Sequence, residues 1–205
     1  MNAANVIAAT QRWLEAVVIG LNLCPFAKAV QVKRQIRYSV TEVTDARALL
    51  DVLGDEMSLL VQADPGAIDT TLLIHPHALT DFVEYAAFLH QANRALRKAG
   101  FEGVLQIASF HPDYVFADGA PGDIENFSNR SPYPMLHLLR EDSVARAVEA
   151  FPDAADIYER NIGTLRRLGH DGLRRLLTEA CIDHRAEDSA PIIRQMRDAG
   201  LHGNP

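Results

Sequence analysis

The fold is decided by two short stretches, Gln35-Ile-Arg-Tyr-Ser-Val-Thr41 and Thr70-Thr-Leu-Leu-Ile74. In the first stretch, apolar and polar residues alternate, which is the pattern of a half-buried strand. The second is a short, mostly apolar run that predicts a buried strand. A helix is expected between them, from an N-cap at Thr44 to the break at 64–66. Strand, helix and strand in this order predict a right-handed βαβ unit.

The same kind of pattern continues on both sides of this unit. Upstream, helically spaced apolar residues predict an amphipathic helix over 5–19 that ends at Gly20. Downstream, the sequence predicts a helix opened by Thr80 and Asp81, a third strand over 104–108, a candidate fourth strand over 114–116, and helices near 134–140, 144–150, 156–168 and 173–181.

These elements define an expected fold class. We predict an α/β fold with a small, mainly parallel sheet of three or four strands, built from βαβ units, covered by helices and followed by a helical C-terminal part. A chain of 205 residues with 48% hydrophobic content can bury one sizeable core. We therefore expect a single α/β domain over 1–183 and a weakly ordered C-terminal tail over 184–205.

Composition excludes several classes of function. The net charge is -7, with acids and bases mixed along the chain, so no basic stripe is available for a nucleic-acid backbone. No stretch approaches the roughly 20 apolar residues that span a bilayer, and no secretory signal opens the chain. Two distant cysteines, Cys24 and Cys181, favour a reducing compartment. The expectation is a cytoplasmic protein with neither a nucleic-acid nor a membrane partner.

Candidate catalytic residues follow the third strand. Ligands of open α/β sheets bind beyond the carboxyl ends of parallel strands, where Ser109-Phe-His-Pro-Asp113 begins, and His75-Pro-His77 follows the second strand in the same way. His111, paired with Asp113 or another carboxylate, is a candidate general acid or base near neutral pH. In the alternative interpretation, His111 and Asp113 cap the turn at Pro112.

The irregular segment 123–141 supplies candidate ligand-binding residues. A helix start at Ser131-Pro132 would place His137, Arg140 and Glu141 on one face, with Arg130 beside a positive helix end. That arrangement suits a small anionic ligand. Alternatively, these polar side chains satisfy the loop's own backbone. The candidates are Asn126, Asn129, Arg130, Tyr133, His137 and Arg140.

Ordered sequence blocks in this region resemble a known family. Leu21-Asn-Leu-Cys-Pro-Phe-Ala27, Ser109-Phe-His-Pro-Asp113 and the block from Asn129 to Glu141 resemble the signatures of the bacterial family called domain of unknown function 1415. The resemblance covers roughly Trp13 to Leu168 and is specific when the blocks are taken together and in order. It implies no activity, substrate or cofactor.

Cys24 is a further candidate catalytic residue. Placed before Pro25, it is a candidate N-cap of a short helix whose dipole would favour the thiolate. In the alternative interpretation it is a small apolar side chain packed beside Leu23 and Phe26.

The chain identifies no cofactor and has no diagnostic metal site. Imidazole and carboxylate groups suit zinc or iron, but none of the available groups has the spacing of a metal motif, and Pro76 interrupts the His-x-His pair. We therefore assign no metal ligand. The groups considered are His75, His77, His111, Asp113 and His137.

Three functional hypotheses result. The first is an enzyme acting on a small anionic metabolite through a His, Arg and Asn pocket formed by residues 109–141. The second is a non-catalytic module that binds a ligand or another protein. The third is a thiol-dependent redox protein that uses Cys24. The reaction, the substrate and the oligomeric state are left open by the sequence.

Overall fold

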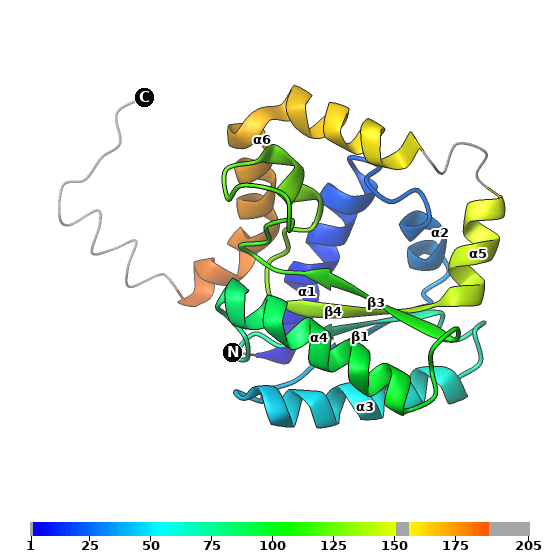
Figure 1. Cartoon of the computed structure of the whole chain (residues 1–205). Helices are drawn as coiled ribbons and strands as arrows, with labels where there is room; N and C mark the ends of the chain where they lie inside the picture. Colours follow the sequence, from blue (N-terminus) through cyan, green and yellow to red (C-terminus); the bar gives the residue numbers. More distant parts are fainter. Residues whose placement is uncertain (1, 151–155, 189–205) are drawn as a thin grey trace.

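A computed structural model describes residues 2–150 and 156–188 of the 205-residue chain (Figure 1). Helices and strands alternate through the first two thirds, and the chain then becomes helical. The elements in chain order are α1 (Ala3–Trp13), the π-helix η1 (Leu14–Ile19), α2 (Ala27–Val32), β1 (Ile36–Val40), α3 (Ala46–Gln62), β2 (Thr70–Ile74), α4 (Phe82–Lys98), β3 (Leu105–Phe110), the 3₁₀-helix η2 (Ile124–Ser128), β4 (Met135–Arg140), α5 (Glu141–Glu149) and α6 (Ile157–Asp188).

The sheet has four strands in the order β1-β2-β4-β3. β1 and β2 are parallel, whereas β4 pairs antiparallel with both β2 and β3. The α/β class and the β1-α3-β2 unit agree with the sequence prediction. The prediction of a mainly parallel sheet is wrong, because β4 returns from β3 and inserts between two strands that run in the same direction.

One face of the sheet is covered by α3 and α4 (Figure 1). Both helices start at an aspartate whose carboxylate accepts two backbone N–H groups, Asp45 for α3 and Asp81 for α4. The cap of α3 is thus one residue later than the predicted Thr44. Leucines and aromatic rings from these helices pack on Leu73, Leu136 and Leu138 of the sheet and form a buried hydrophobic core.

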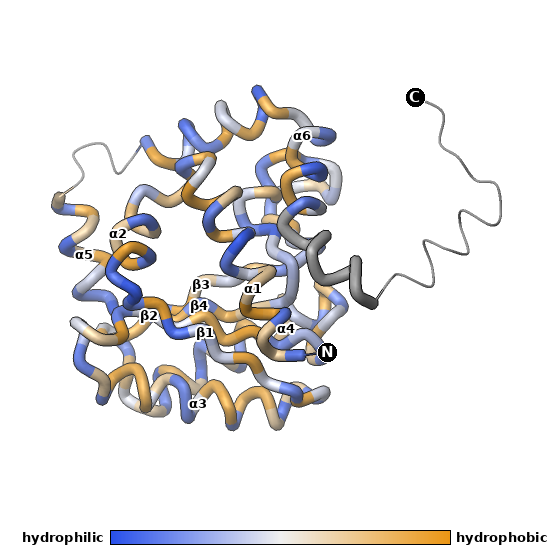
Figure 2. The backbone as a smooth tube through the Cα atoms, turned by 180° about the vertical axis from the view of Figure 1, so that it is seen from behind, coloured by the Kyte–Doolittle hydropathy of each residue, from blue (hydrophilic) through white to orange (hydrophobic). Residues whose placement is uncertain are grey.

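The opposite face is covered by α1 and η1, and α6 packs over these helices; Figure 2 shows α1 and α6 from behind. Trp13, Val17 and Leu23 are buried there against Leu72 of β2 and Met135 of β4. The two helical layers therefore bury different sets of strand side chains, as expected from the period-2 alternation of a strand.

β4 occupies residues for which the sequence predicted a helix. β4 has the sequence Met135-Leu-His-Leu-Leu-Arg140 and lies in the interior of the sheet, with helices over both faces. Because both faces are covered, five of its six residues are apolar or histidine, and apolar and polar residues do not alternate. A short run of this kind has no period that separates a buried strand from a buried helix. The helix predicted to start at Ser131-Pro132 is therefore absent, and with it the helix end proposed beside Arg130.

Other sequence-based boundaries are partly correct. The candidate fourth strand over 114–116 is a turn region instead. The helices predicted at 156–168 and 173–181 are one element, α6, which bends at Gly169, where φ is 66°. α6 continues to Asp188, into the predicted tail, and 189–205 lie outside the described residues. No helix in the described ranges combines the length and apolarity needed to cross a membrane.

The first helix changes from α to π geometry in its second half. The N–H of Gly20 donates to the carbonyl of Glu15, five residues earlier, at 2.9 Å, and Leu23 donates to Val18 in the same way. π-helical turns are rare and recur at functional sites. A Cβ atom at Gly20 would overlap with the carbonyl oxygen of Ala16, so glycine is required where this helix ends.

Two glycine substitutions should therefore have opposite effects on stability. Gly20→Ala is expected to lower the free energy of unfolding by about 1–3 kcal/mol, because a backbone atom must move to admit the methyl group. Gly54→Ala should raise it by about 0.5–1 kcal/mol, because Gly54 lies inside α3 and its Cβ position is open. Urea unfolding of both variants checks this expectation. A Gly20→Ala protein as stable as wild type would contradict the π-helical assignment.

Candidate functional site

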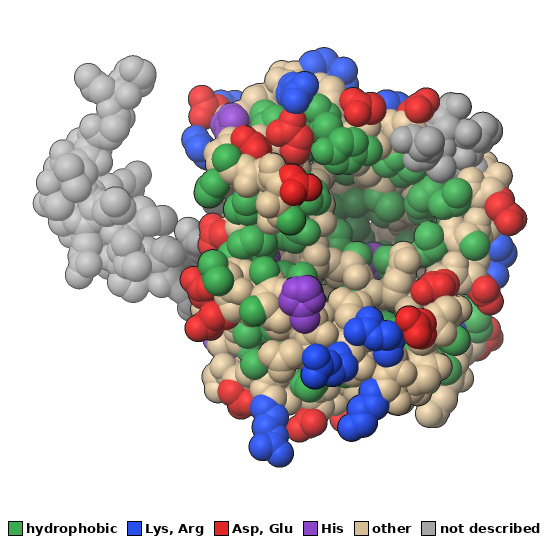
Figure 3. Space-filling view, in the orientation of Figure 1, with side chains coloured by type: hydrophobic (Ala, Val, Ile, Leu, Met, Phe, Trp, Pro, Cys, Tyr) green, Lys and Arg blue, Asp and Glu red, His purple; other side chains and the backbone are tan. Residues whose placement is uncertain are grey.

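A cavity of about 560 Å³ lies between the sheet and the helices of the α1 face. In the space-filling view it is a hollow with mainly hydrophobic walls (Figure 3). Its floor comes from all four strands, and its walls come from α1, η1, α2, α5 and the loop before α2. The lining residues with polar or charged side chains are Asp69, Thr70, Gln106, His137, Arg140 and Ser143, together with the thiol of Cys24 and the indole of Trp13.

Small side chains explain why this face is not filled. Ala108 lies beside His137 in the pairing of β3 with β4, so the sheet has little bulk at this point. Ala27 and Ala29 of the α2 region and Ala147 of α5 face the same space. Protein interiors are normally packed as densely as organic crystals. An unfilled space of this size is therefore typical of a ligand pocket and not of a core.

His137 projects from the centre of β4 and lines the cavity. Its Nε2 lies 2.7 Å from the hydroxyl oxygen of Thr70, and that hydroxyl lies 2.6 Å from the carbonyl oxygen of Leu138. A carbonyl has no hydrogen, so Thr70 donates to Leu138 and must accept from His137. The imidazole is therefore protonated on Nε2, and its Nδ1 has a free lone pair.

Nδ1 of His137 has no hydrogen-bond partner among the described residues, and the ring is half-buried at the cavity. Part of the ring is therefore accessible from the cavity. Burial lowers the pKa of His137 to about 4, so the ring is neutral at pH 7. A neutral acceptor thus lies at the floor of an apolar space.

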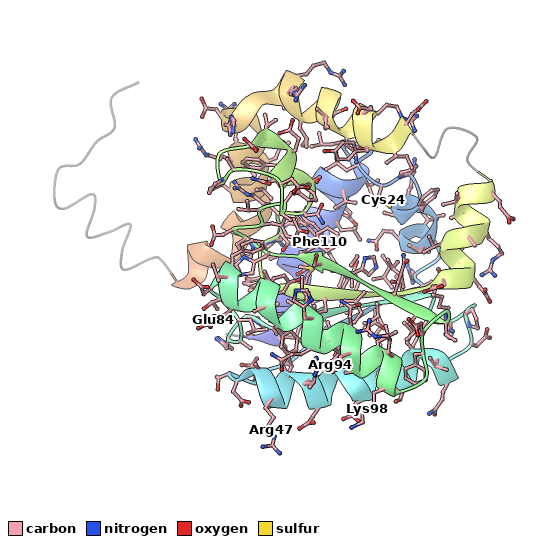
Figure 4. The ribbon with its side chains drawn as sticks, viewed as in Figure 1. Cys24, Arg47, Glu84, Arg94, Lys98 and Phe110 are labelled. Atoms are coloured by element: carbon pink, nitrogen blue, oxygen red, sulfur yellow. The ribbon has the colours of Figure 1, made fainter. Side chains whose placement is uncertain are left out.

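Aromatic rings border the cavity at the carboxyl end of β3. The ring of Phe110 lies 6.2 Å from that of His137 and makes an edge contact with Trp13 at 5.4 Å, measured between centroids. The indole N–H of Trp13 donates to the carbonyl of Arg130 and so fixes α1 to the loop before β4. Figure 4 shows Phe110 and Cys24 on the same side of the sheet, with Cys24 in the segment near α2.

Cys24 lines the cavity but is not the N-cap of α2, because that cap is Phe26, two residues later, and the helix starts at Ala27. Burial raises the pKa of the Cys24 thiol above its ordinary value, although the N–H groups of Phe26 and Ala27 donate toward the sulfur and oppose the shift. The thiol form therefore predominates at neutral pH, which does not favour a reactive thiolate.

Two side chains of opposite charge, Asp69 and Arg140, lie at the amino end of the sheet. Asp69 accepts a hydrogen bond from the hydroxyl of Ser143 at 2.6 Å. A terminal nitrogen of Arg140 donates to the carbonyls of Leu60, Ala63 and Ile68 around the end of α3. Arg140 thus contacts backbone carbonyls at a helix C-terminus, where cations are favourable, and Asp69 carries the opposite charge at the same rim.

His111 lies outside the cavity and is completely buried at the carboxyl edge of the sheet. Its Nδ1 accepts the backbone N–H of Asp113 at 3.0 Å, and its Nε2 donates to the carbonyl of Leu79 at 3.2 Å. Burial lowers its pKa, and both nitrogens are already bonded. These contacts match the turn-capping interpretation. The acid–base role of His111 and Asp113 stays a prediction that the contacts do not favour.

His75 lies beside His111 in the same buried cluster. Its Nδ1 donates to the carbonyl of Ala78 at 2.9 Å, and burial lowers its pKa to about 4. Tyr85 lies between the two imidazoles, donates to the carbonyl of Met135 at 2.8 Å and accepts the N–H of Phe110. His75, His111 and Tyr85 therefore tie the turn after β2 to the ends of β3 and β4.

The side chains of the loop before β4 mainly hold that loop together. Asn126 accepts the N–H of Phe116 and donates to the carbonyl of Ala120, while Asn129 donates to the carbonyl of Ser109 at 3.0 Å. The Arg130 guanidinium donates to the carbonyl of Pro121 and stacks 4.4 Å above the ring of Phe127. Tyr133 packs against the core of the α1 face.

The cavity brings together three of the residues singled out from the sequence, namely Cys24, His137 and Arg140. The others, His111, Asp113, Asn126, Asn129, Arg130 and Tyr133, do not line it. Sequence reasoning missed Thr70, although a threonine at the start of an apolar strand was an available signal.

In the described ranges, no three His, Cys, Asp or Glu residues are grouped to hold a metal ion. His77 instead lies 3.4 Å from Glu42 at the surface.

The resemblance to a known family is confirmed. The chain belongs to the family described as Protein of unknown function (DUF1415), which matches residues 5–175. No curated protein and no solved structure matches the chain. The matched range includes every residue that lines the cavity and leaves its function open.

The buried state of His137 should be measurable as pH-dependent stability. Its pKa is about 4 in the folded chain, against an ordinary value of 6.5, so the unfolded chain binds one more proton between these values. The stability it contributes is complete above pH 6.5 and is lost as the pH falls toward 4. Near pH 5, His137 should therefore raise the free energy of unfolding by about 1.4 kcal/mol for each pH unit.

The variant His137→Gln should lose this contribution to the pH dependence of the free energy of unfolding. His90→Gln, at an exposed position, should keep it. Urea unfolding of both variants and wild type from pH 4.5 to 7.5 makes the comparison. Equal slopes in all three proteins would show that His137 takes up its proton freely in the folded state.

Proposed function

We propose that this protein binds a small, largely apolar molecule in the cavity above the sheet. The observation that carries the proposal is the cavity's size together with its lining. A volume of about 560 Å³ falls within the range of ligand pockets, roughly 300–1,000 Å³. Most lining side chains are apolar, including Leu14, Val18 and Leu72, and a few polar groups among them are available to orient a ligand.

The ligand-binding hypothesis has more support than the other two. An enzyme that binds a small anionic metabolite through residues 109–141 needs its arginines in one pocket, but Arg130 does not line the cavity and Arg140 directs a terminal nitrogen to backbone carbonyls. A redox function of Cys24 needs a stable thiolate, and burial disfavours it. Those two hypotheses stay predictions, and neither draws support from these contacts. Catalysis on a bound apolar substrate remains compatible with the proposal.

The π-helical segment gives further support. Leu14 and Val18 of η1 line the cavity, and the loop that follows η1 carries Cys24 to its wall. The wall is therefore built from a segment with unusual backbone geometry, as is frequent at binding sites. Gly20, which ends this segment, lets the chain turn back toward the sheet.

A neutral fluorescent probe tests the proposal. N-phenyl-1-naphthylamine, which brightens in apolar surroundings, should bind wild type with a saturable rise in fluorescence. Ala147→Phe fills the cavity from α5 and should weaken binding at least about tenfold. Ala145→Phe places the same ring at an exposed position of the same helix and should leave binding unchanged.

Alkylation of Cys24 locates the bound probe. In a Cys181→Ser variant Cys24 is the single cysteine, and bound probe should slow its reaction with iodoacetamide because Cys24 lines the cavity. Ala147→Phe should lose this protection. No saturable binding to wild type, or equal binding to both phenylalanine variants, would contradict the proposed function.

A further inference from the structure

The polar group of the ligand can be inferred from the hydrogen bonds of His137. Thr70 must donate to the carbonyl of Leu138, since those two oxygens lie 2.6 Å apart. Nε2 of His137 must then donate to Thr70. This chain of hydrogen bonds fixes the tautomer, so the group that His137 presents to a ligand is an acceptor and not a donor.

The acceptor has no partner within the protein. None of the described residues bonds Nδ1, and the ring lies beside the open space. A polar atom that faces an apolar cavity without a partner costs free energy unless water or a ligand supplies a hydrogen. A ligand that carries an O–H or N–H group at this point would satisfy it.

The charges of the lining disfavour an ionised ligand. Asp69 and Arg140 are the charged side chains among the described lining residues, and they carry opposite signs. Arg140 also directs a terminal nitrogen to the end of α3. A carboxylate or phosphate that entered the cavity would leave water and would meet the like charge of Asp69 at the rim that carries Arg140, which is unfavourable.

We infer that the cavity takes a neutral ligand with an apolar body and a hydroxyl or N–H group, whose hydrogen is accepted by Nδ1 of His137. This inference rests on the proposed function, because it assigns the polar contact of that same site. The ligand class is that of phenols, alcohols and indoles, as opposed to carboxylic or phosphoric acids. Thr70 is a positioning residue, because it acts through His137.

A matched series of naphthalene compounds tests the inference. Naphthalene, 2-naphthol, 2-methoxynaphthalene and 2-naphthoate share one ring system and differ in having no polar group, a donor, an acceptor or a charge. Binding is measured by calorimetry at pH 7.5 to wild type and His137→Leu. Removing the acceptor should weaken 2-naphthol about tenfold and change 2-methoxynaphthalene less than about threefold. 2-Naphthoate should bind wild type at least about tenfold more weakly than 2-naphthol.

Two further variants keep the test informative if His137→Leu folds poorly. Thr70→Val frees the imidazole to carry its proton on either nitrogen, so the affinity for 2-naphthol should fall relative to that for 2-methoxynaphthalene. His90→Leu, at an exposed position, should change neither affinity.

The possible outcomes separate this inference from the proposed function. If naphthalene binds and every variant affects 2-naphthol and 2-methoxynaphthalene equally, the role of His137 is wrong and the cavity remains a binding site. If 2-naphthoate binds wild type tightest, the ligand is anionic and the inference is overturned. If none of the four compounds binds, the proposed function fails and the inference fails with it.

Discussion

The insertion of β4 between β2 and β3 is the constraint on which the rest of the structure depends. β4 is hydrogen-bonded along both edges and lies between helical layers on both faces, so each of its side chains has a fixed direction. Leu136 and Leu138 enter the core under α3 and α4. His137 faces the opposite layer, and Arg140 reaches the carbonyls at the end of α3. A slip of one residue would exchange these faces.

The two faces of the sheet serve different purposes. Under α3 and α4, large apolar side chains fill the space and supply stability through burial. On the other face, alanines such as Ala108 and Ala147 leave a cavity. The buried histidines divide in the same way, since His75 and His111 hold turns through hydrogen bonds to backbone groups, whereas His137 lies beside the cavity with its Nδ1 free. Stability and binding are thus separated by the sheet.

Local signals in the sequence predicted much of this fold, and non-local ones were missed. The alternation in 35–41, the apolar run 70–74 and the cap at Asp81 depend on neighbouring residues, and the structure has elements there. β4 could not be identified, because a strand buried on both faces has no period and its neighbours are distant in sequence. His137 was selected as a ligand-binding residue on a helix, yet its surroundings come from β2, β3 and η1, which only the tertiary structure brings together.

The central claim is that the hydrogen bonds of Thr70 leave Nδ1 of His137 as a free, unprotonated acceptor in the cavity. Two-dimensional ¹⁵N NMR of histidine-labelled protein at pH 7 measures this directly, because protonated and unprotonated ring nitrogens differ widely in chemical shift. The structure predicts an Nε2–H tautomer for His137, with Nδ1 in the unprotonated range and shifted by added 2-naphthol. An Nδ1–H tautomer, or an imidazolium at pH 7, would contradict the account.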